Sequence, residues 1–199
     1  MTEELYRYEE TLAGEITPFC GVDEAGRGPL AGPVCAAAVI LPAGIEIEGL
    51  DDSKKLTEKK REKLFPVICE KAVSYGVAFA SHTEIDELNI LNATYLAMNR
   101  AIEKLAAMPD IALIDGNRSE GIKYNSRCIV GGDGLSASIA AASVLAKVTR
   151  DRLMRELAEK YPEYKFEQHK GYPTKLHYEM IRKHGPSEIH RRTFLKKLH

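Results

Sequence analysis

The sequence predicts an α/β fold in which a mixed β-sheet is flanked by helices, with a helical portion at the C-terminus. Two observations carry this prediction. Short apolar or alternating segments typical of strands come early in the chain, whereas long stretches with apolar residues at helical spacing come later. Because strands follow strands before most of the helices begin, a mixed sheet is favoured over a strictly alternating parallel barrel.

Five segments have the composition of strands. Residues 19–23 and 34–41 are apolar and are separated by a glycine-rich turn, so we expect them to pair as a hairpin. Residues 73–79 place large apolar side chains at every second position, as a half-buried strand does. The other two segments, residues 111–115 and 128–130, are short apolar runs.

Four segments carry helix signals. Thr57 is a suitable N-cap for a charged helix that extends to about Lys71. Apolar residues recur at helical spacing over residues 91–105, which predicts an amphipathic helix. Two further helices are predicted at residues 136–160 and 174–184, and a proline-containing pair of residues follows each of them.

The length of 199 residues suits one well-buried domain. We expect a single domain over residues 1–199, with a core at about 19–160 and a C-terminal helical segment at about 161–199. No apolar run approaches the roughly 20 residues of a membrane span, and the acidic start lacks the order of a secretory signal. We therefore expect a cytoplasmic monomer with no membrane association.

Cysteine use and charge add two constraints. The four cysteines are widely spaced without a Cys-x-x-Cys pair, so we interpret them as small buried hydrophobes. The chain has a net charge of −1, yet residues 144–199 hold 14 Lys and Arg against 7 Asp and Glu. A basic C-terminal third suits a protein that grips phosphates, although a solvated basic surface explains the charge equally well.

Carboxylates follow three of the strand-like segments. Asp23 and Glu24 end the first, Asp115 ends the run at 111–114, and Asp133 comes just after 128–130. Strand ends are where an open sheet presents ligand-binding groups, and clustered carboxylates repel one another unless a cation lies between them. The pattern therefore predicts a site for Mg²⁺, a hard ion that prefers oxygen ligands.

The glycines after Glu24 have a second possible meaning. Residues 26–31 fit the spacing of a dinucleotide-binding loop, in which glycines precede a helix. Here Pro29 and Pro33 interrupt the turn, and a strand is predicted next, so we reject that interpretation. A loop that lets backbone amides and Arg27 approach a ligand fits the residues better.

The ordered motifs resemble the ribonuclease HII family, also called type 2 ribonuclease H, from about Phe19 to Phe194. A single fragment would be weak evidence, but the ordered set is very specific. The matching segments are Gly21-Val22-Asp23-Glu24-Ala25-Gly26-Arg27-Gly28-Pro29-Leu30-Ala31-Gly32-Pro33-Val34, Asp52-Ser53-Lys54-Lys55-Leu56, Ile114-Asp115-Gly116-Asn117, Gly132-Asp133, Ala140-Ala141-Ala142-Ser143, Ala146-Lys147-Val148-Thr149-Arg150-Asp151 and His169-Lys170-Gly171-Tyr172.

This resemblance implies an RNase H-like fold and an endonuclease that hydrolyses the RNA strand of RNA/DNA hybrids. It also implies cutting 5′ to single ribonucleotides in duplex DNA, with two divalent ions, Mg²⁺ or Mn²⁺, and with 3′-hydroxyl and 5′-phosphate products. The family's metal-site acids fall on Asp23, Glu24, Asp115 and Asp133. Glu24 is the weakest candidate ligand, because adjacent strand residues point to opposite faces. It could act indirectly or through its carbonyl.

The resemblance also implies substrate-binding residues. The loop and the tyrosine that recognise the ribonucleotide at its junction with DNA fall on Gly26, Arg27, Gly28 and Tyr172. We add candidate phosphate contacts at Lys54, Lys147, Lys170 and Arg191, and His169 as a group that positions water or substrate. A solvated surface charge or a structural histidine is the ordinary alternative for each of these. We interpret Asp151 as an ion-pair or capping residue.

The sequence disfavours two other hypotheses. The sister family, ribonuclease HIII, usually has an extra N-terminal domain and lacks the glycine-arginine-glycine loop, so it is rejected. A catalytically silent nucleic-acid-binding module is disfavoured, because all four acids are present.

Overall fold

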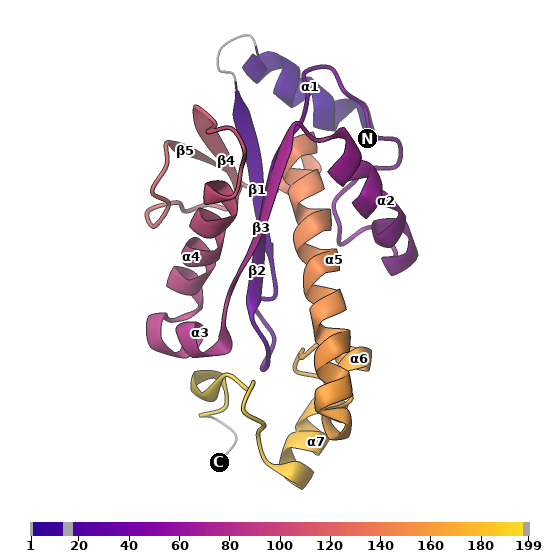
Figure 1. Ribbon diagram of the computed structural model, residues 1–199, viewed down its shortest axis with the longest axis vertical. Helices are drawn as coiled ribbons and strands as arrows, with labels where there is room; N and C mark the ends of the chain where they lie inside the picture. Colours follow the sequence, from indigo (N-terminus) through magenta and orange to yellow (C-terminus); the bar gives the residue numbers. More distant parts are fainter. Residues whose placement is uncertain (1, 14–17, 197–199) are drawn as a thin grey trace.

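A mixed five-stranded sheet forms the centre of the molecule (Figure 1). The structure is a computed structural model that describes residues 2–13 and 18–196. The strand order is β3-β2-β1-β4-β5. The strands are β1 (Phe19–Ala25), β2 (Val34–Ile40), β3 (Ser74–Ala80), β4 (Ile111–Asp115) and β5 (Ser126–Ile129).

Strand pairing confirms the expected hairpin and explains how distant carboxylates meet. β1 pairs antiparallel with β2, and β2 pairs antiparallel with β3. β1 also pairs in parallel with β4, with Val22 opposite Ile114. Because the register continues by one residue, Asp23 and Asp115 come at the same edge of the sheet.

Two helices cover the opposite faces of the sheet (Figure 1). The apolar residues of β2 alternate between them. Ala37 and Val39 join the core under α5 (Ala137–Lys160), whereas Ala36 and Ala38 join the core under α4 (Ile90–Glu103). The whole of β2 is buried, which accounts for its continuous apolar composition.

Small residues allow α5 to lie very close to β1. A Cβ atom placed on Gly21 would be 2.2 Å from the backbone nitrogen of Ile139 and from the backbone carbon of Ser138. Ala140, Ala141 and Ala142 follow on the same helix and are fully buried. This contact positions the start of α5 against the strand that carries Asp23.

The expected helix α2 (Glu58–Lys71) is present, and Thr57 caps it by accepting a hydrogen bond from the amide of Lys60. Helix α1 (Thr2–Ala13) and helix α3 (His82–Leu88) were not predicted. Contacts with residues that are distant in the sequence hold α1 in place. A Glu9 carboxylate oxygen accepts from Ser136 Oγ at 2.5 Å and from the Ser138 amide at 2.7 Å, where α5 begins.

Three buried histidines organise the C-terminal segment, which contains α6 (Phe166–His169) and α7 (Lys175–His184). The ring of His177 stacks on that of His169, with centroids 4.3 Å apart, and its Nε2 lies 3.0 Å from Nε2 of His190. The Ser187 amide donates to Nδ1 of His190, and Nδ1 of His177 contacts the Tyr172 carbonyl. Both rings therefore bond as neutral imidazoles, and burial lowers the pKa of His177 to about 4 and that of His190 to about 3.

The expectation that the cysteines are buried is confirmed in part. Cys20 and Cys35 are fully buried as expected, whereas Cys69 and Cys128 are half-buried. Over residues 2–13 and 18–196, no helix combines the length and the apolar character that crossing a bilayer would require.

The close contact between β1 and α5 gives a stability prediction. Gly21→Ala is expected to lower the free energy of unfolding by about 3 kcal/mol, because backbone atoms cannot move aside as a flexible side chain can. Denaturant unfolding would measure the loss. Gly134→Ala is the control, since the nearest atom to its added Cβ is the flexible Lys55 Nζ at 4.0 Å. Equal stability of the two variants would contradict the proposed contact.

Candidate active site

Three aspartates meet at the carboxyl ends of β1 and β4. Oxygen atoms from Asp23, Asp115 and Asp133 all lie within 4.8 Å of one another. Asp133 comes from the 3₁₀ turn Gly132–Gly134, between β5 and α5. The same turn is tied to β4, because the Gly132 amide donates to Asp115 Oδ1 at 2.8 Å. The structure thus brings together three of the four acids that the sequence indicated.

Burial and mutual repulsion disfavour negative charge in this cluster. Asp23 is 3% exposed and Asp133 is 6% exposed. Burial raises the pKa of Asp23 well above its usual value, and the charges of Glu24 and Asp115 raise it further. Burial and the charge of Asp133 also raise the pKa of Asp115. A cation between the oxygens would remove this repulsion, and an all-oxygen donor set fits Mg²⁺ or Mn²⁺.

Lys54 supplies positive charge to the cluster. Its Nζ donates to Asp133 Oδ2 at 2.7 Å, while its side chain remains 72% exposed. Burial alone would lower the pKa of Lys54, but the bond to Asp133 and the nearby carboxylates raise it. Lys54 therefore lies at the site as expected, with its ammonium group on a carboxylate.

Glu24 has a different environment from the three aspartates. Among the described residues, the cluster of close carboxylate oxygens contains the three aspartates and not Glu24. The Glu24 carboxylate instead pairs with Arg27 at 3.3 Å. Burial raises the pKa of Glu24, whereas the charge of Arg27 opposes that rise. The alternation of side chains along β1 accounts for this separation.

Two buried arginines hold the loop at residues 26–33. Arg191 is fully buried and donates to the carbonyls of Gly26, Arg27 and Gly32. Arg150 is also fully buried and donates to the carbonyls of Ala31, Pro33 and Lys170. The expectation that Arg191 contacts phosphate is therefore wrong, because its guanidinium is enclosed and already bonded to the loop.

Tyr172 faces this loop from the C-terminal segment. Its side chain is partly exposed, and a Cβ atom on Gly28 would lie 3.8 Å from its ring. Lys147 Nζ and the Arg150 guanidinium lie 5.6 Å and 5.8 Å from the ring centroid. Asp151 pairs with Lys147 at 2.8 Å, which confirms the ion-pair interpretation of Asp151.

These groups line one cavity of about 400 Å³ beside the aspartates. It brings together six of the expected substrate-binding residues with two serines that the sequence did not single out. The buried hydroxyls of Ser53 and Ser143 lie 2.7 Å apart, and Ser143 also bonds to Asp23. The expected residues in its lining are Gly26, Arg27, Gly28, Lys54, Lys147 and Tyr172.

His169 and Lys170 lie next to the site but outside this lining. His169 is buried, its Nε2 contacts the Tyr164 carbonyl at 2.9 Å, and its Nδ1 accepts from the Gly171 amide. A role in positioning water or substrate is therefore wrong for His169, which instead shapes the turn before Tyr172. Lys170 bonds through Nζ to the Glu167 carbonyl, and its contact with phosphate stays a prediction.

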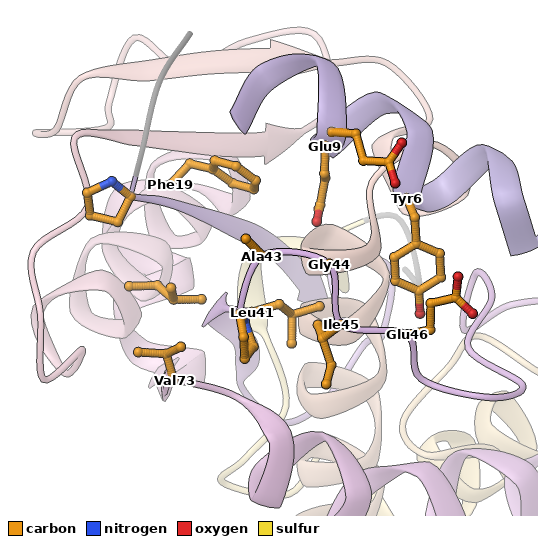
Figure 2. Close-up of a pocket in the computed structure, with 13 residues that line it drawn as sticks. Tyr6, Glu9, Phe19, Leu41, Ala43, Gly44, Ile45, Glu46 and Val73 are labelled. Carbon is orange, nitrogen blue, oxygen red and sulfur yellow. The ribbon is translucent and has the colours of Figure 1, made fainter. Parts of the chain in front are cut away.

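A larger cavity, of about 450 Å³, lies elsewhere, between α1 and the loop after β2 (Figure 2). Tyr6 and Glu9 on one side face Leu41, Ile45 and neighbouring residues on the other (Figure 2). Its lining includes none of the residues that the sequence indicated. Size alone therefore does not identify the functional site in this molecule.

The sheet order, the flanking helices and the carboxylates at the sheet edge define the class of the molecule, a nuclease with an RNase H-like fold. Crystal structures agree with this class. Ribonuclease H2 from Pyrococcus horikoshii OT3 is 31% identical, with a TM-score of 0.72 over 88% of this chain and 92% of that one.

Sequence similarity over nearly the whole chain identifies the family. The model of the family described as Ribonuclease HII matches residues 20–197, so the chain belongs to the ribonuclease HII family. Ribonuclease HII of Caldicellulosiruptor bescii is 56% identical over 98% of this chain and 96% of its own length. That of Endomicrobium trichonymphae is 59% identical over 89% and 85%. The chain is accordingly an endoribonuclease that acts on RNA/DNA hybrids.

The ion pair at Asp133 gives a prediction on metal binding. Because Lys54 must leave Asp133 before a metal ion can use that oxygen, Lys54→Met should raise the affinity of the substrate-free protein for Mn²⁺ several-fold. The same change should lower the metal-free free energy of unfolding by about 1 kcal/mol. Calorimetric titration and thermal unfolding measure the two effects.

Lys55→Met provides the matched control. The Lys55 ammonium is exposed and pairs with Asp51 at 3.4 Å, outside the aspartate cluster. Both quantities should stay at wild-type values in this variant. A Lys54→Met protein with unchanged Mn²⁺ affinity would show that the ion pair does not compete with the metal.

Proposed function

We propose that this ribonuclease also cuts 5′ to single ribonucleotides embedded in duplex DNA, by catalysis with two divalent ions that Asp23, Asp115 and Asp133 bind. The observation that carries the proposal is the position of the cavity of about 400 Å³ beside the aspartates. The Gly26–Gly28 loop and Tyr172 line it, and Glu24 and Lys54 connect it to the aspartates. A strand bound in the cavity would therefore present a phosphate to the acidic cluster.

The chain's own groups determine how the phosphate is held. Asp23 and Asp115 would bind the metal ions from the ends of adjacent parallel strands, and Asp133 would bind them from a turn tied to β4. The bound ions would supply activation of water and neutralisation of the departing 3′ oxygen. Lys54, released from Asp133, is then free to contact phosphate, and Glu24 acts indirectly while it pairs with Arg27.

Selectivity for RNA is assigned to the loop and Tyr172. Locally, the 2′-hydroxyl distinguishes a ribonucleotide from DNA. The carbonyls of Gly26 and Arg27 already accept from Arg191, so we expect the loop's amides to contact that hydroxyl. The Tyr172 ring stacks on the sugar that follows the ribonucleotide. The Lys147 ammonium lies 5.6 Å from the centroid of this ring and pairs with Asp151 at 2.8 Å, which holds it in place.

A duplex DNA with one ribonucleotide tests the proposal. In Mg²⁺ the protein should cut on the 5′ side of the ribonucleotide and leave a 3′-hydroxyl and a 5′-phosphate, which end-labelling identifies. Asp133→Asn should abolish cleavage and retain substrate binding, since it removes one negative oxygen from the metal site. Binding by the wild-type protein without cleavage would favour the silent binding module instead. Near wild-type turnover in Asp133→Asn would contradict the metal site.

Tyr172→Ala should impair cutting at a single ribonucleotide more than cutting within a continuous hybrid. Neighbouring 2′-hydroxyls in a hybrid offer alternative registers, whereas a single ribonucleotide offers one. Losing the contact is worth about 1 to 3 kcal/mol, or roughly 5- to 150-fold in single-turnover rate. Tyr172→Phe keeps the ring and should stay near the wild-type rate. Equal losses on both substrates would leave Tyr172 without a role at the junction.

A further inference from the structure

A further cavity, of about 300 Å³, borders the metal site, since Asp115 is part of its lining. Helix α4 forms one wall with Thr94 and Tyr95, and the segment after β4 forms another with Asn117 and Arg118. This cavity is on the face of the sheet that α4 covers, whereas the cavity with Tyr172 is lined by Ser143 and Lys147 of α5, on the opposite face.

The two cavities share part of their lining at the sheet edge. Glu24 and Arg27 line both of them, and Asp115 of the metal site lines the second. A strand whose scissile phosphate lies on the aspartates therefore has one cavity on each side. Because the substrate is a duplex, its bases stay paired, so the sugar-phosphate backbone is the part that enters.

The direction of the strand follows from the proposed function. The cut is 5′ to the ribonucleotide, so the ribonucleotide and the sugar after it lie on the 3′ side, beside Gly28 and Tyr172. The part of the strand on the 5′ side must then leave across Asp115 toward Arg118.

The lining suits a phosphodiester backbone. The carboxylates of Glu24 and Asp115 lie at the end next to the metal site, and the Arg118 and Asn117 side chains are exposed at residues that follow β4. An arginine can bind a phosphate through two parallel N–H groups, and an asparagine amide can donate a further bond. Tyr95 is fixed in the wall by its hydrogen bond to Glu120.

We propose that this cavity is the subsite for the nucleotide on the 5′ side of the scissile bond, with Arg118 bound to the phosphate that precedes that nucleotide. The proposal rests on the proposed function, because the cleavage position sets which flank faces Arg118.

Charge removal on both partners tests the subsite. Arg118→Ala should weaken binding of the ribonucleotide-containing duplex about 5- to 20-fold, measured by fluorescence anisotropy with Ca²⁺ in place of Mg²⁺. The salt dependence of binding should fall by about one unit. A neutral methylphosphonate one linkage 5′ of the scissile phosphate should weaken wild-type binding similarly. It should not weaken binding by Arg118→Ala any further, because that variant has already lost the contact between Arg118 and this phosphate.

Arg127→Ala is the matched control, since Arg127 is an exposed arginine on the neighbouring strand β5 that does not line the cavity. It should respond to the neutral linkage as the wild type does. The subsite is refuted if Arg118→Ala binds like wild type, or if the neutral linkage weakens both proteins equally. Failure of the wild type to cut the unmodified duplex in Mg²⁺ would instead refute the proposed function, which the binding measurements do not use.

Discussion

The conformation of the loop at residues 26–33 depends on two buried guanidinium groups whose hydrogen bonds, among the described residues, all go to backbone carbonyls. Arg150 and Arg191 together donate six hydrogen bonds to carbonyls, five in the loop at residues 26–33 and one at Lys170. Burial lowers the pKa of Arg191 to about 9, which reflects the cost of enclosing the charge. Hydrogen bonds to a charged donor contribute about 1.5 to 3 kcal/mol each, so the six carbonyls offset that cost and hold an irregular loop in one conformation.

The same bonds connect regions that are far apart in the sequence. Arg150 belongs to the helix that packs on β1, and its Lys170 contact reaches the turn that precedes Tyr172. The paired imidazoles of His177 and His190 extend this connection from the Tyr172 carbonyl to the segment that carries Arg191. The distance from the loop to the tyrosine is therefore set by buried polar groups. The proposed contact with the 2′-hydroxyl would depend on this rigidity, because small displacements of the loop or the ring would remove the discrimination against DNA.

The metal site depends on sheet geometry in the same way. Parallel pairing of β1 with β4 places Asp23 and Asp115 at one edge, and the Gly132–Asp115 bond adds Asp133. Burial and the resulting repulsion raise the pKa of Asp23 and that of Asp115, and Lys54 offsets part of the charge before a metal binds. The stability of the cluster and its affinity for cations thus have one origin, the enclosure of like charges at a strand edge.

The sequence by itself determined the mixed sheet, the main helices and the acids at the strand ends, because periodicity and strand-end position are local properties. It did not reveal α1, whose stabilising contacts, such as Glu9 to Ser136, are distant. Nor could the sequence distinguish a basic side chain that faces solvent from one that folding buries. Arg191 and His169 were therefore assigned to the substrate, whereas folding buries both and uses their nitrogens on backbone groups. Burial is decided by what packs over a residue, and only the tertiary structure contains that information.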